Sequence, residues 1–193
     1  MEPEESIPNL STLLFDISPS GVGSLQTAVA AALLFGSGAL SRFKVDGELR
    51  HSEVERISEI LGIPVESDSI ISENTITNTD QKEPLRVTSL EVSLEENLVS
   101  STPGRDETKL ILVSGERYFG GLLGIKEAVV ASNAWLHATY VDPVRIIAAT
   151  GVLFANEFLA ACLVLPETSS SEKDVISSLC RVAGLETRFG AAG

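Results

Sequence analysis

The chain has 193 residues, enough for one ordinary domain or two small ones, and its 44% apolar and 21% charged residues are typical of a folded globular protein. Its net charge of −13, with no basic cluster, argues against nucleic-acid binding and against contact with anionic membranes. The acidity favours solubility and also attracts basic partners.

The two cysteines and the apolar stretches indicate the compartment. Cys162 and Cys180 lie among apolar residues and are too few for a disulfide framework or a zinc site, so we expect reduced core thiols. The acidic start Met1–Glu5 lacks the positive charge that opens a secretory signal. Neither apolar stretch, at 28–35 or at 144–165, reaches the roughly 18–20 uninterrupted apolar residues of a membrane span. The sequence therefore predicts a soluble, cytoplasmic protein.

Residues 1–66 are expected to form an N-terminal α/β unit. Its expected elements are a strand at 12–15, a helix at 25–35, a strand at 39–45, a turn at 46–47 and a helix at 52–61. Ser52 and Glu55 have the spacing of a capping box, in which the hydroxyl accepts the N3 amide and the carboxylate reaches back. Gly62 is expected to end that helix.

Residues 67–107 differ from the rest of the chain in composition. The stretch 67–84 is polar and lacks helical periodicity, so it is expected to be a long, weakly packed acidic linker. Alternating apolar residues at 86–95 predict one strand within it. By net charge, residues 1–66 and 67–107 each carry −6, whereas the rest carries −1.

Residues 108–193 are expected to form a C-terminal α/β unit. The expected elements are a buried strand at 109–113, a helix at 122–135, a strand at 138–141, a helix at 144–158, a strand at 161–165 and a helix ending at 183. Strands that alternate with helices predict an α/β fold with a mixed or largely parallel sheet covered by helices. The two units can still pack as one domain.

The two units also resemble each other. A shift of 122 positions aligns Ser52 with Asp174 and Gly62 with Gly184, together with the apolar positions between them. The preceding elements align only with a gap of about four residues. We predict an internal repeat of two related strand–helix–strand–helix units, although two unrelated α/β segments with capped amphipathic helices would also look alike.

The loop Gly115–Gly124, between the strand at 109–113 and the expected helix at 122–135, is the first candidate binding site. Exposed amides at a helix N-terminus attract anions, which makes Gly115, Arg117, Gly120 and Gly121 candidate ligand-binding residues. The motif matches neither a dinucleotide fingerprint nor a P-loop. The glycines are explained as well by a tight turn and close packing.

His137 and Asp142 are the candidate catalytic residues. Each lies near an end of the expected strand at 138–141, where a histidine base and a carboxylate that orients it could meet. The structural alternative is that His137 stabilises a helix C-terminus and Asp142 caps the helix that begins at Pro143. With two histidines far apart, no metal site is expected, and no cofactor motif is present.

The sequence leaves enzyme and binding protein both open. The first hypothesis is a non-catalytic binding or assembly subunit that acts through protein–protein contacts, with a protein partner or by self-association into an oligomer. The alternative is a small-ligand enzyme or anion-binding protein with its site at the Gly115–Gly124 loop near His137 and Asp142. A pocket lined by those residues would favour the alternative, and an exposed apolar patch would favour the first hypothesis.

Overall fold

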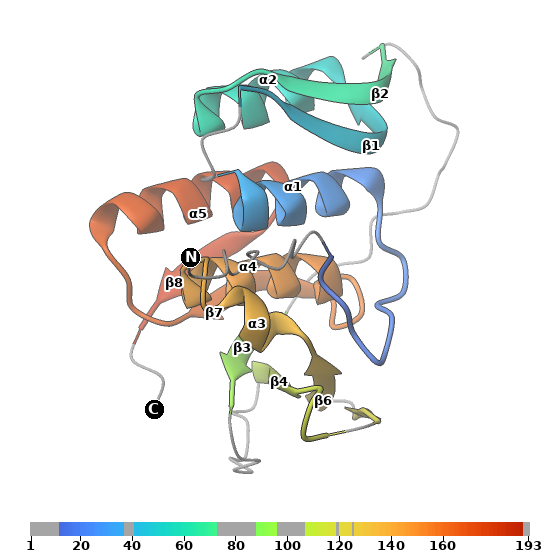
Figure 1. Cartoon of the computed structure of the whole chain (residues 1–193), viewed down its shortest axis with the longest axis vertical. Helices are drawn as coiled ribbons and strands as arrows, with labels where there is room; N and C mark the ends of the chain where they lie inside the picture. Colours follow the sequence, from blue (N-terminus) through green and yellow to red (C-terminus); the bar gives the residue numbers. More distant parts are fainter. Residues whose placement is uncertain are drawn as a thin grey trace, which may run out of the picture.

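The computed structural model describes residues 12–36, 41–72, 88–95, 107–118, 120–124 and 126–190. Two sheets form within these residues. A two-stranded parallel sheet pairs β1 (Phe43–Arg50) with β2 (Val65–Ile71), and a six-stranded sheet has the order β5-β6-β4-β3-β7-β8. Figure 1 shows helices α1 (Ser24–Phe35), α4 (Pro143–Phe154) and α5 (Ser170–Val182) between the two sheets.

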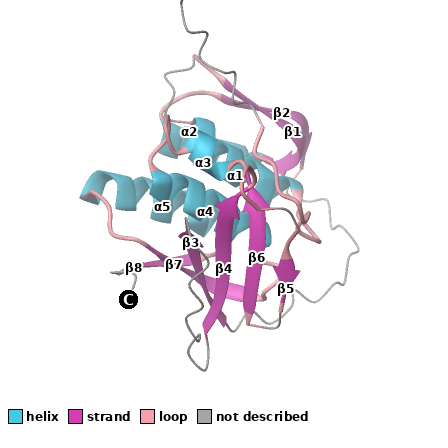
Figure 2. Ribbon diagram, turned by 60° about the horizontal axis from the view of Figure 1, so that its bottom comes forward, coloured by secondary structure: helices cyan, strands magenta, loops and turns pink. Residues whose placement is uncertain are grey.

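The larger sheet confirms the predicted α/β fold class. β3 (Thr88–Leu94), β4 (Glu107–Ser114), β6 (Glu127–Ser132), β7 (Ala160–Leu165) and β8 (Glu186–Phe189) run parallel, and the short β5 (Leu122–Leu123) is antiparallel to β6. The continuous buried run of Leu110–Val113 belongs to an inner strand, as expected for a strand covered on both faces. Figure 2 shows β4 and β6 side by side, with β5 at the outer edge.

The helix expected at 122–135 is wrong. The structure has β5, then β6, and then the short α3 (Ala134–His137) in this range. Along β6 the buried Ala128 and Val130 alternate with the half-buried Glu127 and Val129, a period of two that fits a strand. β4 offers a complete parallel edge to this segment, so pairing with β4 satisfies its backbone groups without a helix.

Three other expectations about the N-terminal unit need correction. The strand expected at 39–45 lies at 43–50, and it continues through the expected Asp46–Gly47 turn as a bulge in which Gly47 has a φ of 120°. Helix α2 (His51–Leu61) begins before Ser52, so the Ser52–Glu55 capping box does not form. Instead Glu53 Oε2 accepts a hydrogen bond from the backbone N–H of Arg50 at 2.7 Å.

The described residues test the linker predicted at 67–107 only in part. β2 extends to Ile71, and β3 confirms the strand expected near 86–95. Residues 73–87 and 96–106 lie outside the described residues, and with them most of the stretch expected to be weakly packed.

The order helix, strand, helix and strand occurs twice, as α1-β1-α2-β2 and as α4-β7-α5-β8, and both strand pairs are parallel. α1 packs against α4, and α2 packs against α5. The strands expected at 12–15 and 138–141 are wrong, because 12–15 contributes only an isolated bridge at Phe15 and 138–141 is a turn. The internal repeat itself stays a prediction.

Buried apolar residues from both units belong to one cluster, which runs from Ala28 of α1 through Ile57 of α2 to Leu185 beside β8. No helix in the described part of the chain combines the length and the apolar character that crossing a bilayer requires.

The two cysteines are free and buried, which leads to a prediction about their reactivity. Burial raises the pKa of the Cys180 thiol to about 12, and burial also raises the pKa of the Cys162 thiol. We expect neither thiol to react with a disulfide reagent at pH 8 in the folded protein, and both to react after unfolding in guanidinium.

The same shift makes the stability depend on alkaline pH. The folded Cys180 thiol keeps its proton where the unfolded thiol, with a pKa of about 8.5, loses it. The contribution of Cys180 to the free energy of unfolding is therefore intact below the pKa of the unfolded thiol. It falls as the pH rises toward the pKa of the folded thiol. Rapid labelling of Cys180 in the native state at pH 8 would contradict its burial.

Candidate functional site

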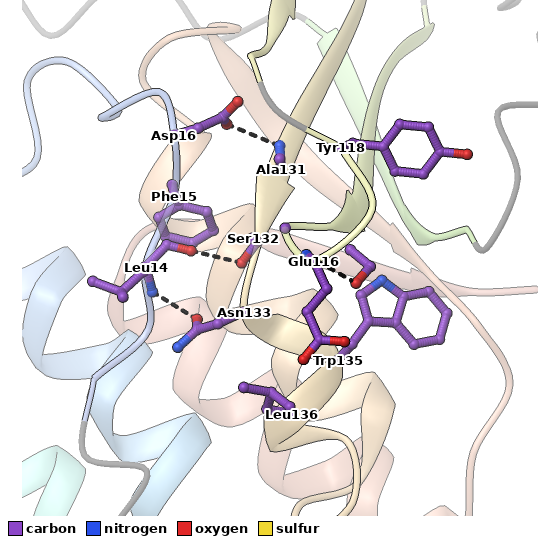
Figure 3. Close-up of a pocket in the computed structure, with 12 residues that line it drawn as sticks. Leu14, Phe15, Asp16, Glu116, Tyr118, Ala131, Ser132, Asn133, Trp135 and Leu136 are labelled. Carbon is purple, nitrogen blue, oxygen red and sulfur yellow. Dashed lines mark hydrogen bonds between the residues drawn. The ribbon is translucent and has the colours of Figure 1, made fainter.

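A cavity of about 360 Å³ lies where β4 and β6 end. These strands are parallel neighbours that end at Ser114 and Ser132, which are paired in register. Ligands of open α/β sheets bind at the carboxyl ends of the strands. Figure 3 shows three walls: the N-terminal segment around Phe15, the loop that follows β4, and the end of β6 with α3.

The first wall is a segment that we name the strap, residues 12–16. It runs antiparallel to the end of β6, where the Asp16 N–H donates to the carbonyl of Ala131 at 3.0 Å. The Ala131 N–H in turn donates to Asp16 Oδ1 at 2.8 Å. Asn133 holds the other end, since its Oδ1 accepts from the Leu14 N–H at 2.7 Å and its Nδ2 donates to the Thr12 carbonyl at 2.8 Å. The strap therefore depends on residues more than a hundred positions away in the chain.

Removing the Asn133 side chain is expected to release the strap. Asn133→Ala deletes both hydrogen bonds, and we expect a loss of about 1–2 kcal/mol in the free energy of unfolding together with faster amide exchange at Leu14. Asn133→Asp keeps the acceptor for Leu14 and loses the donor to Thr12. Its free energy of unfolding and its amide exchange at Leu14 should therefore lie between those of the unmodified protein and of Asn133→Ala. Unchanged exchange at Leu14 in Asn133→Ala would contradict this role.

The second wall is the turn after β4. The Ser114 carbonyl accepts from the N–H groups of Arg117 and Tyr118, and the Gly115 N–H donates to the Ser132 carbonyl at 2.9 Å. A Cβ at Gly115 would lie 3.3 Å from that carbonyl oxygen, so a glycine allows the turn to approach β6 closely. The turn places the exposed Glu116 beside the cavity.

The third wall is formed by α3. Its Leu136 is exposed, while Trp135 is half-buried and its Nε1 is a buried donor with no hydrogen-bond partner among the described residues. In Figure 3 the indole nitrogen lies on the side of the ring nearer to Glu116. An unpaired buried donor costs about 1–3 kcal/mol, and a ligand with an oxygen acceptor would recover part of that cost.

The two candidate catalytic residues do not line this cavity. His137 is 2% exposed, and its Nε2 lies 3.1 Å from the Thr12 carbonyl, so it helps to hold the strap. Asp142 caps α4, because its Oδ1 accepts from the Val144 N–H at 2.8 Å and its Oδ2 from the Thr168 hydroxyl at 3.3 Å. No hydrogen bond joins His137 to Asp142 among the described residues, and each has a structural role.

Of the four candidate ligand-binding residues, Gly115 lines the cavity. Arg117 is exposed in the turn after β4, Gly120 has a φ of 90°, and Gly121 packs closely against Ile17 and the Val129 carbonyl. None of these three lines the cavity. No helix begins near Gly121 in the part of the chain that the structure describes, where β5 follows instead, so the helix dipole expected to attract an anion is not found there.

Sequence reasoning missed the strap, Asn133 and Trp135 as site residues. A polar residue directly after a strand indicates a candidate site residue. This signal can be read only once 127–132 is recognised as a strand and not as a helix. Within the described residues, no three His, Cys, Asp or Glu side chains lie together in a way that could hold a metal ion. Comparison with protein families, curated proteins and solved structures finds no match for this chain.

Proposed function

We propose that this protein is a non-catalytic binding subunit, and that the cavity beside the strap receives an apolar side chain of a partner protein. The observation that carries the proposal is the rim of the cavity, where Leu14 is 59% exposed and Leu136 is 44% exposed. Large exposed apolar side chains next to a cavity are typical of interaction sites.

A third large apolar side chain is exposed just after α3. Tyr140 is 55% exposed and follows Leu136 by four residues, within a turn whose N–H groups at 138–141 donate to carbonyls of α3. A surface wider than the cavity favours a macromolecular partner over a free metabolite.

The polar groups of the cavity support binding better than catalysis. Ser132 Oγ donates to the Leu14 carbonyl at 2.8 Å and accepts from the Ala134 N–H at 3.1 Å, so its hydroxyl is committed to structure. No histidine, lysine, arginine or cysteine is among the described residues that line the cavity. A nucleophile such as Ser114 therefore has no histidine or lysine within the lining to activate it.

A small-ligand protein, enzyme or not, is the second candidate. It is favoured by the position of the cavity at the carboxyl ends of two parallel strands, where small ligands collect in α/β folds. The cavity volume is near the lower end of the usual range for such sites.

Site-specific photo-cross-linking in cells separates the two candidates. Leu136 is replaced by p-benzoylphenylalanine, and Ile70, an apolar residue on β2 that is somewhat more exposed, is replaced in the same way as a control. We expect a protein adduct at position 136 that is absent at position 70 and is lost when Leu14→Ser is added. An adduct with a small molecule would favour the second candidate, and a cross-link between two copies would identify self-association. Equal labelling at positions 136 and 70 would contradict a specific site.

We also propose a cytoplasmic location for the protein. The support is the pair of free, buried cysteines, since such thiols are typical of reducing compartments. No direct role in nucleic-acid binding is proposed, because the net charge of −13 would repel phosphates.

A further inference from the structure

We infer that the apolar group held in the cavity is attached to, or lies next to, a positively charged nitrogen, for which Glu116 is the counter-ion. This inference rests on the proposed function and adds the chemical class of the group that binds: an apolar body with an ammonium or guanidinium group and an oxygen acceptor nearby. A basic residue adjacent to an apolar residue in a partner protein has this chemistry.

The charged side chains that line the cavity all have one sign. The ionisable acids in its lining are Asp16 and Glu116, and no basic residue is among the described residues that line it. Asp16 is engaged through Oδ1 with the Ala131 N–H, so its charge is partly compensated. Glu116 forms no ion pair within the part of the chain that the structure describes, not even with the adjacent Arg117.

The position of Glu116 suits a counter-ion. In Figure 3 its side chain extends from the turn after β4 toward Trp135 and Leu136, over the apolar part of the cavity. A cation placed there would meet the carboxylate of Glu116. An apolar group attached to that cation would reach the apolar walls formed by Phe15 and Leu136.

Trp135 supplies an independent reason for a polar atom on the ligand. Its Nε1 is buried without a partner among the described residues, and an indole nitrogen can only donate. This N–H is closed to solvent in the structure, so a carbonyl or hydroxyl oxygen of the ligand would accept its hydrogen bond once the indole turns the N–H toward the cavity. The peptide group beside a basic residue provides such an oxygen.

The overall charge acts in the same direction. With a net charge of −13, the protein attracts cations and repels anions at long range. This long-range effect weakens with salt, because the Debye length shortens from about 30 Å at 0.01 M to about 3 Å at 1 M. A local pair with Glu116 adds a contribution that a single neutralising substitution removes.

The test uses three probes with one apolar body: 3-phenylpropylamine, 3-phenyl-1-propanol and 3-phenylpropanoate. Trp135 is the only tryptophan of the chain, so emission excited at 295 nm reports on this cavity. We expect saturable emission changes, with the amine bound about twofold to fivefold more tightly than the alcohol and the carboxylate most weakly. Glu116→Gln should abolish the preference for the amine and leave the affinity for the alcohol unchanged.

Two further variants complete the test. Glu116→Asp keeps the charge and should retain part of the preference, and Glu186→Gln, which removes one exposed charge on β8, controls for net charge. Equal affinities for amine and alcohol in the unmodified protein, or a preference that survives Glu116→Gln, would overturn the inference while leaving the cavity as a binding site. Emission unchanged by all three probes would contradict the proposed function as well as the inference.

Discussion

Glu172→Gln is expected to lower the free energy of unfolding by about 3 kcal/mol. Glu172 holds Arg145 in a two-bond pair, with Nε 2.6 Å from Oε2 and Nη2 3.2 Å from Oε1. Arg145 is 6% exposed and its Nη1 has no partner among the described residues, so a neutral amide would leave the guanidinium buried without a counter-charge. Losing one partner of a buried pair costs about 3–5 kcal/mol, and the 29% exposure of the Glu172 side chain places the effect at the lower end.

A surface pair provides the matched control for this experiment. Glu167 pairs with Lys173, and both side chains are substantially exposed, so Glu167→Gln should cost less than about 1 kcal/mol. The double substitution Arg145→Met with Glu172→Leu should recover most of the loss, because it removes both charges from the buried position. Urea denaturation of the variants gives these differences, and equal losses for the two Gln substitutions would show that the Arg145 pair is not decisive.

Phe154→Ala is expected to cost about 4 kcal/mol. Phe154 is among the largest fully buried side chains, at the end of α4, and truncation would leave a cavity in the shared core. Its ring also meets the ring of Phe15 edge to face, with centroids 5.3 Å apart and an interplanar angle of 84°. Phe15 belongs to the strap, so the substitution should loosen the wall of the binding cavity too.

Phe154→Leu tests whether volume or the aromatic contact matters. It fills most of the space and should cost less than about 2 kcal/mol, yet it removes the ring contact with Phe15. Hydrogen exchange at Leu14 and Asp16 follows the strap separately from global unfolding measured by urea. Normal protection of the strap in Phe154→Ala would show that the hydrogen bonds to Asn133 and Ala131 hold it without the ring.

The candidate site was predictable from sequence only at one residue. The strand-end rule led to the loop after 109–113, and Gly115 does line the cavity. Arg117, Gly120 and Gly121 do not, because the rule was applied with a helix at 122–135 that the structure replaces with β5, β6 and α3. Asp142 has the role given as the structural alternative, because it caps α4. His137 has a different structural role from the helix C-terminus expected for it, because its Nε2 bonds the Thr12 carbonyl of the strap.

Local sequence pattern alone predicted the helices and strands whose apolar spacing and end residues lie within or beside the element itself. The strands at β3, β4 and β7 and the helices α1, α2, α4 and α5 were all predictable, because each has a continuous or alternating apolar run and glycine or proline near an end. The α/β class follows from their alternation.

Tertiary structure decided the segments whose partners lie far along the chain. The range 127–132 carries an apolar spacing that suits a helix or a strand, and the free edge of β4 selects the strand. The strap does not form the strand expected at 12–15, and its position is set by Asn133 and Ala131, about 115–120 residues away. The cavity exists only because these distant segments come into contact at the ends of β4 and β6, and no local pattern in the sequence predicts that contact.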